Sequence, residues 1–251
     1  MVESKSVTVV GATGLIGRQL VPMLTAAGHD VTEVSRATGV DVLTGTGLDK
    51  AVHGAAAVID VINSASPDDS SEAFFTQASS NLAAAVTKAG VGHYVVLSIV
   101  GADRLAPLAG YMRGKIAQEV AAAESGVAWT VVRATQFHEL AEPITESMIT
   151  ADEVRVPDAM IQTVDSAEVT AILARAVDGT ALNAIHEVGG PQKMPFADMA
   201  RAVLTHQRRA LEVVVDPSAT YNGLPVDNGT LVTGDDAEHG AQRLVDWLAG
   251  R

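Results

Sequence analysis

The sequence predicts an α/β protein built on a doubly wound parallel sheet. Short β-branched runs alternate with longer segments of helical periodicity, and three of those segments close on a glycine. Alanine and valine are abundant, whereas aromatic residues make up only 4% of the chain. Strands and helices in regular alternation pair in parallel through right-handed crossovers, with helices on both faces. Small aliphatic side chains suit buried strands covered by closely packed helices.

The alternation is clearest in the first half of the chain. Strands are predicted at residues 6–10, 30–36, 56–63, 93–98 and 128–134. Helices are predicted at residues 17–28, 71–90 and 114–126, because apolar side chains recur there at helical spacing and each segment ends at glycine. A further short strand is expected just before Asp41.

From about residue 135 the alternation loosens. Short strand candidates at residues 153–157, 184–190 and 211–215 mix with helix candidates at 166–177 and 195–204. No linker rich in proline, glycine and serine separates the halves. We therefore expect one domain over residues 1–251, with a core at about 1–150 and a small C-terminal α/β lobe at about 151–251, which would bind substrate.

Composition and charge narrow the function classes. The 251 residues carry a formal net charge of −13, and an acidic surface repels nucleic acid, so no direct nucleic-acid partner is expected. The chain has no cysteine, which excludes disulfides and thiolate chemistry. It shows neither a signal-peptide pattern nor an apolar run of about 18 residues. We expect a cytoplasmic protein without a membrane partner.

The stretch "VVGATGLIG", residues 9–17, carries the first chemical signal. A strand runs into three glycines spaced three apart, and a helix follows. Gly11 permits a tight turn, Gly14 lets a backbone approach a pyrophosphate, and Gly17 lets the helix pack on the strand. A diphosphate would bind the unpaired N–H groups at the helix start, where the helix dipole also favours it. The pattern predicts dinucleotide binding, although the spacing also fits a simple tight turn.

The second predicted strand indicates which dinucleotide. Its tip carries Ser35 and Arg36, and an arginine fork matches a 2′-phosphate, which favours NADP(H) over NAD(H). Glu33 would favour NAD(H) if the strand ended two residues earlier. Asp41 and Val42 are candidates for the adenine side, with a turn-capping role as the alternative for Asp41.

Three further residues form a candidate catalytic set. Tyr111 and Lys115 lie four apart, on one face of a helix, and Ser98 ends a predicted strand thirteen residues before Tyr111. A tyrosine can protonate the alkoxide that hydride addition leaves, and a lysine cation favours its phenolate. Ser98 would orient the substrate oxygen, and Lys115 would also hold the ribose. On an exposed helix the same Tyr–Lys spacing is often a solvated pair.

Several stretches resemble the short-chain dehydrogenase/reductases, in particular their atypical NmrA-like NAD(P)-binding group. They are "GATGLIG" (11–17), "SRATGVDV" (35–42), "VLSIVGAD" (96–103), "YMRGKIAQE" (111–119) and "VAWTVVRATQFHE" (127–139). The resemblance covers nearly the whole chain and is loose over the last 40 residues. It implies a Rossmann-type core with a small substrate lobe. It also implies that Gly11, Ala12, Thr13, Gly14, Leu15 and Ile16 hold the pyrophosphate, and that Asn63, Ser64 and Thr135 to Phe137 flank the nicotinamide.

The expected function is an NADPH-dependent oxidoreductase that reduces a small or medium-sized apolar carbonyl compound. Tyr111 would donate the proton, with Ser98 and Lys115 assisting. The alternative, which the NmrA-like group suggests, is a non-catalytic NADP(H)-binding redox sensor that acts through a partner protein. An isomerase, or a reductase of a flavonoid-like or quinone substrate, would share the fold. An oligomer is compatible with the alanine-rich helix around residue 120, and no metal site is expected, since the histidines lack ligand spacing.

Overall fold

The computed structural model describes residues 4–66 and 68–251. The chain divides into two compact units. The first contains the chain up to Ser98 together with Ala106–Arg133 and Thr170–His186, and the second contains Ile99–Leu105, Ala134–Val169 and Glu187–Arg251. The division near residue 150 stays a prediction.

A seven-stranded sheet has the order β12-β9-β5-β4-β3-β1-β2. Its strands are β1 (Ser6–Val10), β2 (Asp30–Val34), β3 (Ala57–Asp60), β4 (His93–Ile99), β5 (Trp129–Ala134), β9 (Ala184–Gly189) and β12 (Glu238–His239). β1 pairs in parallel with β2 on one side and with β3 on the other. The winding of the chain therefore reverses at β1, and ligands of such sheets bind beyond the carboxyl ends of the strands at this switch point. The predicted doubly wound class is confirmed.

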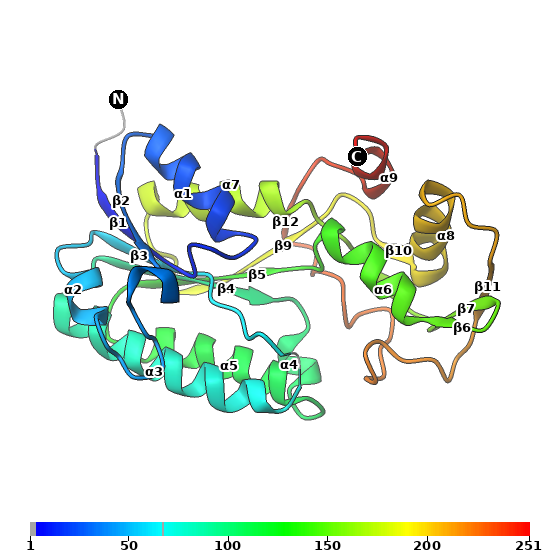
Figure 1. The fold of residues 1–251 in the computed structure, drawn as a ribbon, viewed down its shortest axis with the longest axis horizontal. Coiled ribbons are helices and arrows are strands. Elements are labelled where there is room, and N and C mark those ends of the chain that lie inside the picture. The colour runs from blue at the N-terminus through cyan, green and yellow to red at the C-terminus, as the bar shows by residue number, and fades with distance from the viewer. Residues whose placement is uncertain (1–3, 67) are drawn as a thin grey trace. The chain divides into compact units, whose positions relative to one another are not determined.

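Helices cover both faces of this sheet. Helices α1 (Gly17–Ala26) and α7 (Ser166–Asp178) lie on one face, and α3 (Ser70–Ala89) and α5 (Gly110–Ala123) lie side by side on the other (Figure 1). Gly114 permits the close approach of α5 to α3, because a Cβ there would lie 2.7 Å from the ring of Phe75. Phe75 and Tyr94 are fully buried in the core between these helices and the sheet.

Several elements differ from the sequence prediction. β2 ends at Val34 rather than at residue 36, and β3 ends at Asp60 rather than at residue 63. Their last predicted residues instead leave the sheet and form the loops of its carboxyl edge. Helix α5 begins at Gly110, four residues early, because Asp69 of a neighbouring loop accepts the Gly110 N–H at 2.6 Å. The expected strand before Asp41 is replaced by a short 3₁₀ helix, η1 (Arg36–Thr38). Helix α2 (Leu48–Val52) follows it.

The second unit has small sheets and helices of its own. β11 (Glu212–Val215), β7 (Glu153–Val156) and β6 (Ile149–Thr150) form one sheet in that order, and β8 (Met160–Ile161) pairs with β10 (Met194–Pro195). The helices are α4 (Ala102–Leu105), η2 (His138–Leu140), α6 (Ala141–Ser147), α8 (Phe196–His206) and α9 (Leu244–Ala249). The buried Gln162 amide donates to Gly190 O at 2.7 Å and accepts from Thr233 N at 3.0 Å, which joins three segments distant in sequence.

Candidate active site

The glycine loop that follows β1 is constrained by its neighbours. Gly11 has φ +93°, and a Cβ on it would lie 2.8 Å from the carbonyl oxygen of Val61, just beyond β3. A Cβ on Gly17 would lie 2.3 Å from Gly11 O, whereas one on Gly14 would meet only Gly11 O at 3.3 Å. Gly11 and Gly17 thus serve the turn and the helix packing, whereas Gly14 is exposed and a Cβ on it would be tight only against the loop's own Gly11 O.

The loop also leaves N–H groups without partners. Among the residues that the structure describes, the amides of Thr13, Leu15 and Ile16 donate to no protein atom. Thr13 and Leu15 are exposed, and helix α1 begins directly after them. Unpaired amides at a helix start form an anion site, so this loop fits the diphosphate of a dinucleotide.

The loop is joined directly to the end of β2. The N–H groups of Gly11 and Ala12 both donate to Val34 O, at 2.9 and 3.2 Å. Ser35 and Arg36 follow at once, and the Arg36 side chain is exposed and pairs with no group in the described part of the chain. An unpaired guanidinium beside a dinucleotide loop fits a 2′-phosphate. β2 does end two residues early, and Glu33, within the strand opposite Val9, is also exposed.

The predicted adenine-side residues belong to a turn. Asp41 Oδ1 accepts the N–H of Leu43 at 2.8 Å, so this carboxylate caps its own turn. Asn81 of α3 donates to the carbonyls of Val42 and Leu43 at 2.9 and 2.8 Å. The side chain of Asn81, which the sequence offered no reason to place here, therefore holds the loop of residues 41–43 against α3.

Tyr111, on α5, contacts the loop after β3. Its hydroxyl donates to Asn63 Oδ1 at 2.8 Å, and the same oxygen accepts the N–H of Ser64 at 2.9 Å. The ring packs edge-on against Phe75, with centroids 5.6 Å apart. Burial raises the pKa of Tyr111 to about 12, so the phenol is protonated at neutral pH.

Lys115, one turn further along α5, points into the interior of the first unit. Its ammonium donates to Leu97 O at 2.7 Å and to Gln118 Oε1, and lies 5.0 Å from the centroid of the Phe75 ring. Gln118 in turn donates to Asp60 Oδ2 at 2.7 Å. Burial lowers the pKa of Lys115 to about 8 and raises the pKa of Asp60, because it penalises the charged form of each.

Ser98 is bonded into a second buried group. Its hydroxyl donates to Glu119 Oε1 at 2.5 Å, and Arg133 of β5 binds both oxygens of the same carboxylate, at 2.9 and 2.7 Å. The hydrogen bonds of Ser98, Tyr111 and Lys115 thus run to three separate sets of partners, and none joins two of the three. Their joint catalytic role stays a prediction. Neither Glu119 nor Arg133 is among the site residues that the sequence predicts.

Thr135 and Phe137 belong to the second unit. Thr135 N donates to Val188 O at 2.9 Å, and its buried hydroxyl oxygen has no partner within the described residues. Phe137 is half-buried and precedes η2. The buried ring of His138 has partners within the protein for both nitrogens, Thr163 Oγ1 at 2.9 Å and Gln242 O at 3.0 Å.

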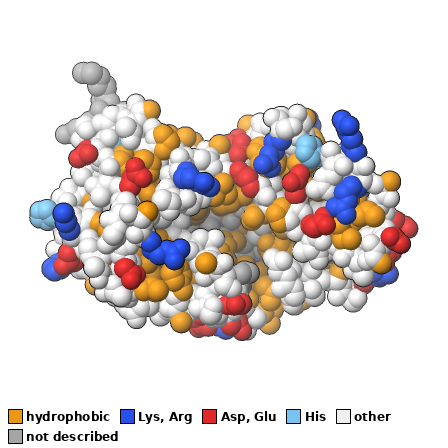
Figure 2. Space-filling view, in the orientation of Figure 1, with side chains coloured by type: hydrophobic (Ala, Val, Ile, Leu, Met, Phe, Trp, Pro, Cys, Tyr) orange, Lys and Arg blue, Asp and Glu red, His pale blue; other side chains and the backbone are white. Residues whose placement is uncertain are grey.

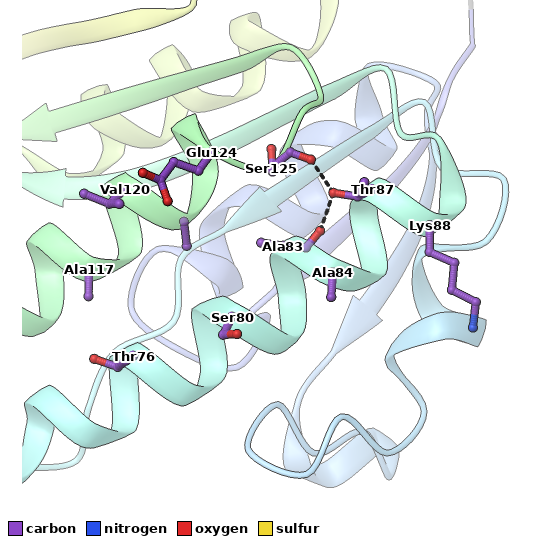
Figure 3. Close-up of a pocket in the computed structure, with 11 residues that line it drawn as sticks. Thr76, Ser80, Ala83, Ala84, Thr87, Lys88, Ala117, Val120, Glu124 and Ser125 are labelled. Carbon is purple, nitrogen blue, oxygen red and sulfur yellow. Dashed lines mark hydrogen bonds between the residues drawn. The ribbon is translucent and has the colours of Figure 1, made fainter.

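A groove of about 720 Å³ lies on the outer side of α3 and α5, away from the predicted site residues (Figure 3). Small side chains such as Ala84 and Ala117 line it, and Thr87 donates to Ala83 O and Ser125 O at its end. Over the described ranges no acidic or histidine cluster suits a metal ion, and no helix is long and apolar enough to cross a bilayer. On the face in Figure 2, acidic and basic side chains are interspersed.

Comparison with known proteins identifies the family. The model of the NAD(P)H-binding family matches residues 11–180. The chain belongs to this family. A reductase of Streptomyces griseus, (4-alkanoyl-5-oxo-2,5-dihydrofuran-3-yl)methyl phosphate reductase, is 31% identical over 234 residues, which cover 85% of this chain and 79% of that protein. The predicted short-chain dehydrogenase type, the oxidoreductase class and NAD(P)(H) as the cofactor class are thereby confirmed.

Solved structures support the fold. A nucleoside-diphosphate-sugar epimerase of Staphylococcus aureus matches with a TM-score of 0.74 and 14% identity over 97% of this chain and 99% of that one. WbmG of Bordetella bronchiseptica, in complex with NAD, matches with a TM-score of 0.74 and 16% identity over 99% and 93%. RMD of Pseudomonas aeruginosa, complexed with NADPH, matches with a TM-score of 0.67 and 16% identity over 91% and 90%. At these identities the likeness concerns the fold alone.

Proposed function

We propose that this chain is an NADPH-dependent reductase of a small or medium-sized apolar carbonyl compound, with Tyr111 as the proton donor. The observation that carries the proposal is the position of the Tyr111 hydroxyl. It bonds to Asn63, three residues beyond the end of β3, and the chain just beyond β3 touches the glycine loop at Val61 and Gly11. A proton donor at the carboxyl edge of the sheet, beside a dinucleotide loop, suits carbonyl reduction.

The cofactor would be held by the loop and by the residues after β2. The free amides of Thr13, Leu15 and Ile16 suit its diphosphate, and the exposed Gly14 has no side chain to keep the diphosphate away from the backbone. Ser35 and Arg36 would take the adenosine end, with the Arg36 guanidinium on the 2′-phosphate. Bound there, the reduced nicotinamide supplies the hydride.

Tyr111 would act as a neutral acid. With its pKa near 12 it holds its proton at neutral pH, and an alkoxide is a base strong enough to take that proton. In the free protein the proton points to Asn63 Oδ1. For transfer the hydroxyl turns to the substrate oxygen, while Asn63 Oδ1 keeps the N–H of Ser64 as a partner. Asn63 would thus orient the phenol in the free protein, and its Oδ1 would still have a partner after the hydroxyl has turned away.

The named relative supports the substrate class. Its substrate, by name, carries a ring carbonyl, an alkanoyl carbonyl and a ring carbon–carbon double bond conjugated with both. From this name we take only that a reductase of this family acts on a compound with activated carbonyl groups, and we leave the phosphate ester to the relative. Suitable test compounds are therefore apolar ketones, aldehydes and alkanoyl lactones.

Replacing Tyr111 by Phe tests the proposal. We expect kcat to fall by at least about 100-fold, the usual contribution of a positioned acid, while the dissociation constant of NADPH changes less than about twofold. Turnover is followed by loss of NADPH absorbance, and NADPH binding by its fluorescence. An active Y111F enzyme would remove Tyr111 from the mechanism.

A non-catalytic NADP(H)-binding regulator is the second candidate. The observation that favours it is that the hydroxyl proton of Ser98 and the ammonium of Lys115 are both used inside the protein. A regulator would bind NADP⁺ and NADPH with different affinities and would consume no NADPH with any of the carbonyl compounds. Turnover with one of them, lost in Y111F, would decide for the reductase.

A further inference from the structure

We propose that Lys115 is a positioning residue, which ties α5 to the backbone of β4 and so fixes Tyr111, and that it does not bind the ribose of the cofactor. The second half concerns binding alone. The first half rests on the proposed function, since it assigns Lys115 a role through the proposed proton donor. Sequence spacing alone predicts the opposite, a lysine directed at Tyr111 and the ribose.

The hydrogen-bond inventory of Lys115 supports this inference. An ammonium group has three N–H donors and no acceptor. One donates to Leu97 O at 2.7 Å, one donates to Gln118 Oε1, and the ammonium also faces the Phe75 ring at 5.0 Å. Lys115 as a whole is only 4% exposed. The third N–H faces the Phe75 ring, so a ribose hydroxyl would have to reach this buried ammonium and replace the ring contact or one of the two hydrogen bonds.

The ammonium of Lys115 also lies near a buried carboxyl group, that of Asp60. Asp60 is fully buried and accepts hydrogen bonds from Gln118, Tyr94 and the N–H of Ile62. The nearby ammonium and Asp60 attract one another, and Gln118 links them. Movement of the ammonium toward a ligand would leave the interior without this positive charge and the Leu97 carbonyl without this donor, which is costly at a buried site.

The geometry of α5 explains how Lys115 acts on Tyr111. The two side chains are one helical turn apart, and both contact Phe75 of α3. The bond to Leu97 O anchors α5 to β4, while Phe75 packs against Tyr111 and under the ammonium. Removal of the lysine therefore loosens the turn of α5 that presents the Tyr111 hydroxyl to Asn63.

Amine labelling of the wild-type protein tests the ribose half without any variant. Lysines are acetylated with and without NADPH, and the modified sites are read by mass spectrometry. Lys88, whose side chain is 73% exposed, serves as the reactive internal reference. We expect Lys115 to stay at least about tenfold less reactive than Lys88 under both conditions. A Lys115 that reacts readily in the free protein and is protected by NADPH would overturn the inference.

The variant Lys115→Met tests the positioning half, with Lys88→Met as the matched control. We expect the dissociation constant of NADPH and the KM for NADPH to stay within about twofold, while kcat falls about tenfold. A tenfold weaker NADPH affinity, or an unchanged kcat, would contradict the proposal.

A readout without turnover separates this inference from the proposed function. The chain has three tyrosines, so a spectrum of ¹³C-tyrosine-labelled protein, with Y111F for assignment, isolates the Tyr111 signal. That signal should shift in K115M and not in K88M, even if no carbonyl compound is reduced. An unmoved signal would show that Lys115 does not position Tyr111. If K115M does not fold, the labelling experiment still decides the ribose half, and the milder Gln118→Ala, which removes one partner of Lys115, should shift the same signal.

Discussion

The glycine loop after β1 and the interior pair Ser98 and Lys115 differ in whether their polar atoms have hydrogen-bond partners in the protein. In the loop, the amides of Thr13, Leu15 and Ile16 have no partner within the described residues. In the interior pair, Ser98 donates to Glu119, and Lys115 donates to Leu97 O and Gln118. Thr13, Gly14 and Leu15 of the loop are exposed, whereas Ser98 and Lys115 are buried.

Under the proposed function, this difference separates the residues that bind the cofactor from the residues that hold the fold. Water can hydrogen-bond an exposed amide in the unliganded protein, and a ligand can later replace that water. An exposed loop can therefore keep unpaired amides with little loss of stability. A buried hydroxyl or ammonium must find its partner within the protein, because an unpaired polar group in the interior is costly. The two groups, which the sequence assigns to one candidate site, therefore differ in how far their polar atoms are open to a ligand.

The largest effect is expected from Glu119→Gln. This variant removes one charge of the buried Glu119–Arg133 pair, whose side chains are 8% and 9% exposed. Loss of one partner of a buried pair costs about 3–5 kcal/mol, or roughly 6–20 °C in Tm for a chain of this size. Thermal unfolding measures it, and Glu124→Gln, at an exposed position ending the same helix, is the control. Equal Tm values for the two variants would show that the pair does not hold the fold.

An intermediate effect is expected from Arg36→Ala, on the ligand-binding side of the comparison. Loss of a charge-assisted bond to phosphate should weaken NADPH binding by about 10–100-fold. Affinity for NADH and Tm should stay nearly unchanged, because Arg36 has no described partner in the protein. Fluorescence titration with both cofactors measures this, with the exposed Arg243→Ala as the control. Equal losses for NADPH and NADH would exclude the 2′-phosphate contact and favour Glu33 as the deciding residue.

The smallest effect is a pH dependence of stability from Lys115. Its pKa is about 8 in the folded protein, whereas an unperturbed lysine has a pKa of 10.5. Between these values the unfolded chain binds more protons, so the free energy of unfolding should rise with pH, by at most about 1.4 kcal/mol per unit. Urea unfolding from pH 7 to 10 should show this rise in the wild type relative to K115M. If the free energy of unfolding of the wild type minus that of K115M stays constant or falls over this pH range, the pKa of Lys115 is not lowered by folding.

Much of the fold is readable from local patterns. The run "SVTVV" is β1 at the predicted residues. Helices α1 and α3 end at Ala26 and Ala89, and the chain leaves them through Gly28 and Gly90, which accept the positive φ of +94° and +65°. The boundaries that differ, at Val34, Asp60 and Gly110, depend on partners distant in sequence. Helix α5, for example, begins at Gly110, whose N–H donates to the carboxylate of Asp69.

The sequence by itself determined the α/β class, the dinucleotide loop and the position of Arg36 after the second strand, because these depend on residues adjacent along the chain. The tertiary structure decided the surroundings of Ser98, Tyr111 and Lys115. Four-residue spacing places Tyr111 and Lys115 on one helix face, but it does not say what that face meets. Here Asn63 lies beside Tyr111, while Leu97, Gln118 and Phe75 surround Lys115. Burial then moves their two pKa values apart, to about 12 and about 8. Desolvation depends on every element packed around a group, and that information is not local in the sequence.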